Sequence, residues 1–256
     1  MAERKIRIIV AAHKPYWMPE EEMYIPLQVG AAGKESIGFR RDDEGENISE
    51  KNANYCELTG LYWAWKNLEA DYIGLAHYRR HFAGGKHGGS KEARVITEAE
   101  VREKLKGADI LLPTPRHYRI ETNYSQYAHA HHARDLAAVR EILGEMHPEC
   151  LRPWDESMKR TVGHRFNMFI MKKEQMDDYC EWLFGILGEL EQRLDISGYS
   201  GNDRRVFGFV SERLTDVWLA ARGAAYRDTP YIFMEKQNWI AKGGKVVRRK
   251  MLGGRE

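Results

Sequence analysis

Cysteine is scarce in this sequence of 256 residues, and the three that occur lie far apart. Cys56, Cys150 and Cys180 form no CxxC pair, which argues against a disulfide scaffold or a structural zinc site and for reduced thiols in the cytoplasm. No apolar run approaches the ~20 residues of a membrane-spanning helix, and the first residues turn polar too early for a secretory signal. We therefore expect a cytoplasmic protein.

An excess of charge of one sign is also missing. Lys and Arg number 40 against 38 Asp and Glu, which leaves a formal net charge of +2. This balance excludes the polycation that non-specific nucleic-acid binding requires, so we expect no nucleic-acid partner. A hydrophobic content of 43% in turn excludes a disordered chain and allows one large core.

Three common catalytic motifs are absent. There is no Walker-type loop, which argues against a P-loop kinase, and no GxGxxG after the first apolar run, where AAHKPYW stands instead. No GxSxG elbow of a serine hydrolase occurs. The function must therefore come from other residue patterns.

Apolar runs typical of strands alternate with amphipathic segments typical of helices. Strands are predicted at residues 6–12, 71–76, 108–112 and 167–171, and helices at 55–68, 97 onward, 124–146, 175–194 and 203–221. Asn54 is the expected N-cap of the helix at 55–68, and Thr97 with Glu100 forms a capping-box pattern. The alternation predicts an α/β fold in one domain, with a mostly parallel sheet flanked by helices, a core at about residues 6–222 and a basic extension at 223–256.

Cationic side chains follow or precede the predicted strands. These loop-end residues are His13, Lys14, His77, Tyr78, Arg79, Arg80, His164 and Arg165, with Asn167 at the start of the last strand. In open α/β sheets, ligands bind beyond the carboxyl ends of the strands. Arginine binds a diphosphate through two parallel charge-assisted hydrogen bonds. The pattern therefore favours an anion site, although each cluster is also compatible with a solvated loop end.

Histidine is concentrated in the segment AHAHHARD. A zinc site would need ligands at i, i+4 on one helix face and a third ligand, whereas His129, His131 and His132 give only i, i+2 and i, i+3 spacings. We favour a polar helix face near an acceptor cleft, with Asp135 one turn further on, and expect no metal ligands.

One long stretch of the sequence resembles a known family. The run YCELTGLYWAWKNLEADYIGLAHYRRHF, with AAHKPYWMP upstream and GHRFNMFIM and RRVFGFVSERL downstream, is similar to a bacterial family long catalogued as a domain of unknown function. Its members occur in capsular-polysaccharide, exopolysaccharide and O-antigen clusters and are regarded as glycosyltransferases, some of them galactofuranosyltransferases. The resemblance covers roughly residues 7–219, and HYRR after a strand is its most specific element.

The resemblance implies a GT-A-like fold and a donor site without metal. GT-A enzymes carry an Asp-x-Asp metal motif after a helix and a strand, and here His77, Tyr78 and Arg79 fill that place. Without a carboxylate the usual ion is not recruited, whereas arginines can neutralise the leaving diphosphate directly. In this picture the donor-binding residues are the loop-end residues together with Asn54, Glu57 and Arg205, with Glu57 also explicable as a helix-dipole carboxylate.

An inverting transferase needs a carboxylate that deprotonates the acceptor hydroxyl. Our candidates are Glu212, which lies in an otherwise apolar segment, and Asp203, at the opening of the last long helix. An internal salt bridge with Arg205 or Arg213 is the alternative role of Glu212. Asp135 and Asp109 are weaker candidates.

The sequence thus predicts a hexosyltransferase. We expect it to move a sugar from a nucleotide donor, such as UDP-galactofuranose, to a glycan or lipid-linked acceptor in surface polysaccharide synthesis, without a cofactor. A non-catalytic carbohydrate-binding or assembly protein on the same fold is the alternative, and a phosphotransferase or nuclease is a third hypothesis, weakened by the missing pair of metal-binding carboxylates.

The end of the chain is basic. The cationic residues of this tail are Lys242, Lys245, Arg248, Arg249, Lys250 and Arg255. Two interpretations stay open, a frayed solvated end and docking to an anionic membrane surface, where each basic residue adds ~1 kcal/mol. The second would place the protein at the inner face of the membrane.

Overall fold

The computed structural model describes residues 4–85, 88–118 and 120–235. The basic tail, on which the predicted membrane contact depends, lies outside these residues. No helix in the described part of the chain has the length and apolar character that crossing a bilayer requires.

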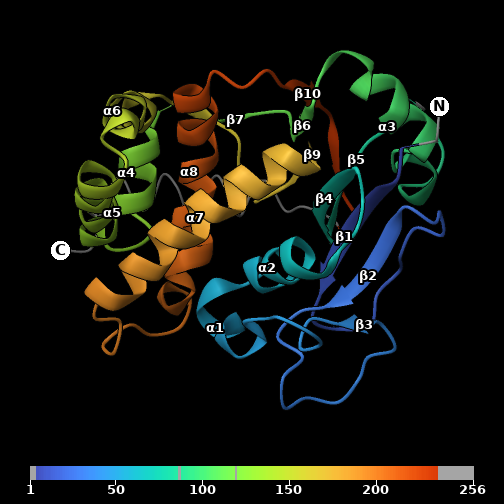
Figure 1. Cartoon of the computed structure of the whole chain (residues 1–256), viewed down its shortest axis with the longest axis horizontal. Coiled ribbons are helices and arrows are strands. Elements are labelled where there is room, and N and C mark those ends of the chain that lie inside the picture. Colours follow the sequence, from blue (N-terminus) through green and yellow to red (C-terminus); the bar gives the residue numbers. More distant parts are fainter. Residues whose placement is uncertain (1–3, 86–87, 119, 236–256) are drawn as a thin grey trace.

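A twisted sheet forms the centre of the fold (Figure 1). Its strands, in spatial order, are β10 (Arg227–Thr229), β6 (Ile110–Pro113), β9 (Phe169–Lys172), β4 (Tyr72–His77), β1 (Ile6–Ala12), β2 (Tyr24–Gln28) and β3 (Arg40–Arg41). Two short strands extend β4 at its end: β5 (Arg80–Phe82) pairs with β4, and β11 (Tyr231–Phe233) pairs with β5. A separate ribbon joins β7 (Arg116–His117) to β8 (Val162–Gly163).

Along the row of strands from β10 to β3, most neighbouring strands run parallel, which confirms the predicted α/β class. Strand β1 is parallel to β2 and β4, β2 is parallel to β3, and β6 is parallel to β10. Strand β9 is the exception in this row, because it runs antiparallel to both β4 and β6. The short strands β5 and β11 outside the row are also antiparallel to their partners. The near-continuous apolar sequence of β1 is what a parallel strand buried on both faces requires.

The two faces of the sheet carry different cores. Ile9 and Ala11 of β1 point into the larger core, which contains the apolar side chains of α2 (Leu58–Asn67), α7 (Lys173–Arg193) and α8 (Val206–Arg222). Ile8 and Val10 point into a smaller core with α3 (Glu98–Lys104) and the β5 segment. The helices α4 (Asn123–Ala128), α5 (Ala133–Met146) and α6 (Leu151–Lys159) form a layer beside α7 and α8 (Figure 1).

Two predicted helices are interrupted. The segment predicted as one helix at 55–68 consists of α1 (Asn52–Tyr55) and α2, separated at Cys56, whose φ is 54°. Asn54 therefore lies inside α1, and the prediction that it caps the helix is wrong; its amide donates to the carbonyl of Arg204 at 2.7 Å. The segment predicted at 124–146 is likewise divided into α4 and α5. The capping box of Thr97 and Glu100 on α3 is confirmed.

The polar segment before α1 is ordered around a buried carboxylate. Asp42 is fully buried and accepts hydrogen bonds from the backbone N–H groups of Gly30 and Ala31 and from the hydroxyls of Ser49 and Thr59. A buried charge requires partners of this kind. The contacts fix the chain from β2 to α2, and with it the turn that contains Cys56.

Candidate active site

A cavity of about 260 Å³ opens where β1 and β4 end. The side chains and backbone that line it belong to His13, Val29, Asn52, Ala53, Cys56, Glu57, His77, Arg79 and Arg205. Five of these were predicted as donor-binding residues. Their meeting follows from the topology, since parallel strands β1 and β4 end at the same edge of the sheet.

The cavity is electropositive. The pKa of His13 is lowered by partial burial and by the nearby charges of Arg79, Lys14 and Arg205. His77 is more deeply buried, and burial together with Arg80 and Arg79 lowers its pKa to about 2. The backbone N–H of Arg79 donates to Nδ1 of His77 at 3.2 Å. His77 is therefore neutral, with Nδ1 acting as acceptor.

Arg80 lies largely buried next to this cavity. Its guanidinium carbon is 4.0 Å from the centroid of the Phe166 ring and 5.7 Å from that of Phe233. Burial lowers the pKa of Arg80, although Glu212 and Glu57 oppose that effect. Its Nε has no hydrogen-bond partner among the described residues. A buried guanidinium with a free donor is suited to an anionic ligand.

Tyr78 packs against His13, one of the residues that line the cavity. Its side chain is buried, with its ring centroid 5.3 Å from that of His13 and 5.0 Å from that of Tyr16. The ammonium of Lys14 lies 5.5 Å from the centroid of the same ring. Tyr78 thus orients His13 and Lys14, two residues predicted to bind the donor.

Glu57 is the carboxylate that lines the cavity. Its Oε1 accepts a hydrogen bond of 2.8 Å from the amide of Asn167. Asn167 also donates to the carbonyl of Gly208 at 3.1 Å and accepts from the hydroxyl of Ser211 at 2.9 Å. Burial raises the pKa of Glu57, and the hydrogen bond from Asn167 only partly offsets this effect. Asn167 therefore fixes Glu57 against α8.

The backbone is strained at both sides of this contact. Phe166 and Asn167 have φ of 82° and 50°, and Cys56, directly before Glu57, has φ of 54°. Such conformations cost ~1–3 kcal/mol each and are concentrated at functional sites. The Nε of Arg205 donates to Sγ of Cys56 at 3.0 Å, and burial raises the pKa of this thiol to about 11. Cys56 was not among the predicted site residues, because no sequence pattern indicates its backbone conformation.

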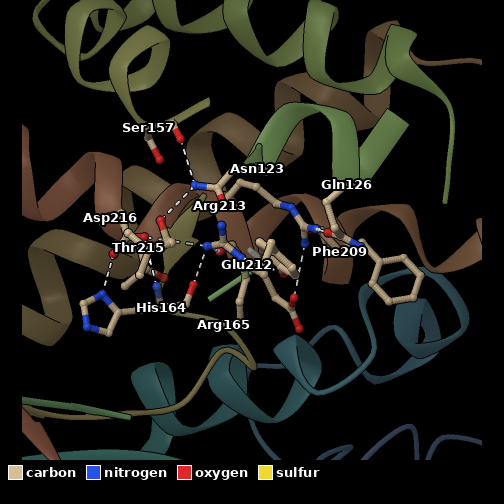
Figure 2. Close-up of polar contacts among 12 residues, drawn as sticks. Asn123, Gln126, Ser157, His164, Arg165, Phe209, Glu212, Arg213, Thr215 and Asp216 are labelled. Carbon is tan, nitrogen blue, oxygen red and sulfur yellow. Dashed lines mark hydrogen bonds and ion pairs between the residues drawn. The ribbon is translucent and has the colours of Figure 1, made fainter. Parts of the chain in front are cut away.

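Glu212 is bound by a buried arginine. Figure 2 shows Arg213 between Gln126 and Glu212. Arg213 donates to Oε2 of Glu212 at 3.2 Å, to the carbonyl of Phe209 at 3.0 Å and to Oε1 of Gln126. The side chain of Glu212 is 20% exposed. Glu212 thus forms the predicted internal salt bridge, and it is not among the residues that line the cavity.

Asp203 is paired with histidines. Nδ1 of His131 lies 3.1 Å from Oδ1 of Asp203, and Nε2 of His132 lies 3.7 Å from Oδ2. The ring of His131 stacks on Phe209 with centroids 4.3 Å apart. Within the described ranges, no group of three or more His, Cys, Asp and Glu residues is arranged to hold a metal ion.

His164 and Arg165 lie outside the cavity, in a polar network with residues of α8 (Figure 2). Burial lowers the pKa of His164, but hydrogen bonds with Asp216 and Asp228 outweigh burial and raise it. Arg165 donates to the carbonyls of His164 and Glu212. The structure therefore places these two predicted donor ligands outside the lining of the cavity, where they hold α8 against the sheet.

Comparisons with known proteins agree with the architecture. The profile of a family described as "Domain of unknown function (DUF4422)" matches residues 7–223. A solved apo structure of the WbbM bifunctional glycosyltransferase superposes with a TM-score of 0.82 and 32% identity over 91% of this chain. The match spans 46% of the WbbM chain, so this protein corresponds to about half of it. No curated protein sequence matches.

Proposed function

Because the chain belongs to the DUF4422 family, and because half of a bifunctional glycosyltransferase shares its fold, we propose that it is a glycosyltransferase. It transfers a hexose from a nucleotide-sugar donor to a glycan or lipid-linked acceptor in surface polysaccharide synthesis. The observation that carries this proposal is the cationic cavity at the ends of β1 and β4, lined by His13, Arg79 and Arg205.

The donor diphosphate is the natural ligand of this cavity. Arg79 and Arg205 line it, and Arg80, next to Arg79 in the chain, has a buried Nε with no hydrogen-bond partner in the part of the chain that the structure describes. When the bond between the sugar and the diphosphate breaks, negative charge develops on the leaving group, and fixed cations that lie close to it stabilise the transition state. The proposed reaction therefore uses arginines where related folds use a metal ion, and the proposed donor is a UDP-linked sugar such as UDP-galactofuranose.

A donor screen in the presence and absence of EDTA tests both parts of the proposal. Sugar transfer or slow donor hydrolysis is measured with UDP-, GDP- and CMP-linked sugars. We expect turnover with one donor class and equal rates with the chelator. Loss of all turnover in EDTA would refute the metal-free part, and glycan binding without any nucleotide binding would favour the non-catalytic alternative.

The role of Arg79 is tested by substitution. Arg79→Ala should lower turnover at least ~10²-fold, the usual loss when one group that stabilises the transition state is removed, while Arg79→Lys should retain part of it. Arg152→Ala is the matched control, because that side chain is 82% exposed and, among the described residues, pairs only with Glu156 on its own helix. Normal turnover in Arg79→Ala would remove this residue from the mechanism.

A further inference from the structure

We propose that Glu57 is the general base that accepts the proton of the acceptor hydroxyl, and that Asn167 is the positioning residue that holds it. The inference rests on the proposed glycosyltransferase function. It differs from the sequence-based assignment, which gave the base to Glu212 or Asp203 and placed Glu57 at the donor.

Access to the cavity distinguishes the three carboxylates. Glu57 lines the cavity beside His13, His77 and Arg79. Glu212 and Asp203 are not part of that lining: Glu212 is engaged by Arg213, and Asp203 is engaged by His131. A general base must lie within hydrogen-bond reach of the proton that it takes. Glu57 is the carboxylate that meets this condition for a substrate bound in the cavity.

Glu57 has one side-chain partner among the described residues. Asn167 donates to Oε1, and the backbone of Glu57 itself also hydrogen-bonds the carboxylate, which leaves Oε2 as the oxygen without a side-chain donor in the described ranges. Asn167 is itself fixed by Gly208 and Ser211 of α8 and is 3% exposed. With its oxygen accepting from Ser211 and one N–H directed at Gly208, the amide of Asn167 is held with its other N–H toward Oε1 of Glu57, and this contact orients the carboxylate.

The electrostatic surroundings keep Glu57 basic. Burial and the charge of Glu212 raise its pKa, whereas the amide of Asn167 and the charge of Arg80 lower it. The other ionisable groups around it are Cys56 in its own turn and His13, His77, Arg79 and Arg205 in the cavity lining. A carboxylate whose pKa lies above its ordinary value takes a proton more readily at neutral pH than an exposed one.

The proposed step is balanced. The acceptor oxygen forms a bond to the anomeric carbon as its proton passes to Oε2 of Glu57. The bond between that carbon and the diphosphate oxygen breaks, and the nucleoside diphosphate leaves with the electron pair, stabilised by the arginines. Glu57 then releases the proton to solvent.

Glu57→Gln tests the assignment, with Glu212→Gln as the matched variant. We expect Glu57→Gln to lower kcat for transfer by ~10²–10⁴-fold while UDP binding measured by calorimetry stays within ~3-fold. Glu212→Gln should retain most of the transfer rate. Near-normal transfer by Glu57→Gln, or loss confined to Glu212→Gln, would overturn the proposal. Failure of the parent chain to use any nucleotide sugar would instead refute the proposed function.

The positioning role of Asn167 has its own readout. Glycine tolerates a φ of 50°, so Asn167→Gly preserves the backbone conformation. It removes the hydrogen bond that lowers the pKa of Glu57. The acid limb of kcat/KM against pH should therefore move to higher pH in this variant, with UDP binding unchanged. A loss of rate with an unmoved acid limb would show a structural role alone and would refute the positioning assignment.

Discussion

Glu57 illustrates, at the scale of one residue, how a reactive group is kept at a cost in stability. Its pKa is raised in the folded state, so the folded chain holds the proton more tightly than the unfolded chain. Stability that is present below the ordinary pKa of a glutamate is lost as pH rises through the folded pKa. Ionised Glu57 at neutral pH is thus destabilising.

We predict that Glu57→Gln raises the melting temperature at pH 8. The amide carries no charge to desolvate, and its oxygen can still accept from Asn167. In a chain of this size, a gain of about 1 kcal/mol raises Tm by ~2–4 °C. Scanning calorimetry at pH 8 and pH 3 checks this, since the difference should vanish at pH 3, where glutamate is protonated in both states. A lower Tm at pH 8 would contradict the prediction.

For His77, the expected change in stability with pH has the opposite sign. Its folded pKa is lowered to about 2, so between pH 6.5 and about 2 the unfolded chain binds a proton that the folded chain does not. Stability must fall as pH decreases, by up to about 1.4 kcal/mol per pH unit for one proton. We expect His77→Gln to lose less stability than the parent between pH 7 and pH 5. Urea unfolding at several pH values measures the two slopes, and equal slopes would refute the assignment.

The sequence could predict part of the site at this scale. Of the residues predicted after β1 and β4, His13, His77 and Arg79 line one cavity, because strand order fixes where these two loops meet. The contact between Asn167 and Glu57 could not be predicted, since it depends on two left-handed backbone positions far apart in the sequence. His164 and Arg165 were predicted as donor ligands from their charge and position, but they form hydrogen bonds inside the protein. Charge in the sequence does not distinguish these two roles.

At the scale of elements, periodicity predicted the strands better than the helix breaks. Strand β1 was predicted with its observed bounds, Ile6–Ala12. The break between α1 and α2 coincides instead with side-chain contacts to Cys56: Asn52, four residues earlier, donates to its carbonyl, and Arg205, far away in the sequence, donates to its sulfur. A local pattern of apolar residues contains no information about such contacts.

The packing of α8 on this break can be tested through Gly208. A Cβ added there would lie 3.0 Å from Sγ and 3.1 Å from Cβ of Cys56, so in Gly208→Ala either Cys56, which lines the cavity, or α8 must shift. We expect lower stability and at least a ~10-fold lower turnover, because a misplaced catalytic group costs up to ~10²-fold. Gly185→Ala on α7 is the matched control: it meets no atom within 4 Å and should stabilise by ~0.5–1 kcal/mol.

A second substitution separates crowding from other effects. Cys56→Gly removes the contacting side chain and also suits a φ of 54°. The double variant Cys56→Gly, Gly208→Ala should therefore recover stability relative to Gly208→Ala alone, as measured by urea unfolding. Additive losses in the two substitutions would show that contact with Cys56 is not what makes glycine necessary.

At the scale of the whole molecule, the chain beyond the family match completes the site. The match ends at residue 223, yet β10 extends the sheet and β11 pairs with β5. The backbone N–H of Met234 donates to the carbonyl of Arg79 at 3.0 Å, and Glu235 lies 3.6 Å from the guanidinium of Arg79. Residues near the end of the described chain thus hold the cationic segment that follows β4.

Truncation tests this dependence. A chain that ends at Gly223 loses the strand paired with β5 and the ring of Phe233 next to Arg80, so we expect a lower Tm and loss of UDP binding. A chain that ends at Glu235 keeps every one of these contacts and should bind UDP like the parent. Phe233→Ala tests whether loss of UDP binding can occur without unfolding. It should weaken UDP binding several-fold while circular dichroism stays unchanged. Unaltered UDP affinity in the shorter chain would mean that β11 does not organise the arginines, because the cavity would then be complete within the family match.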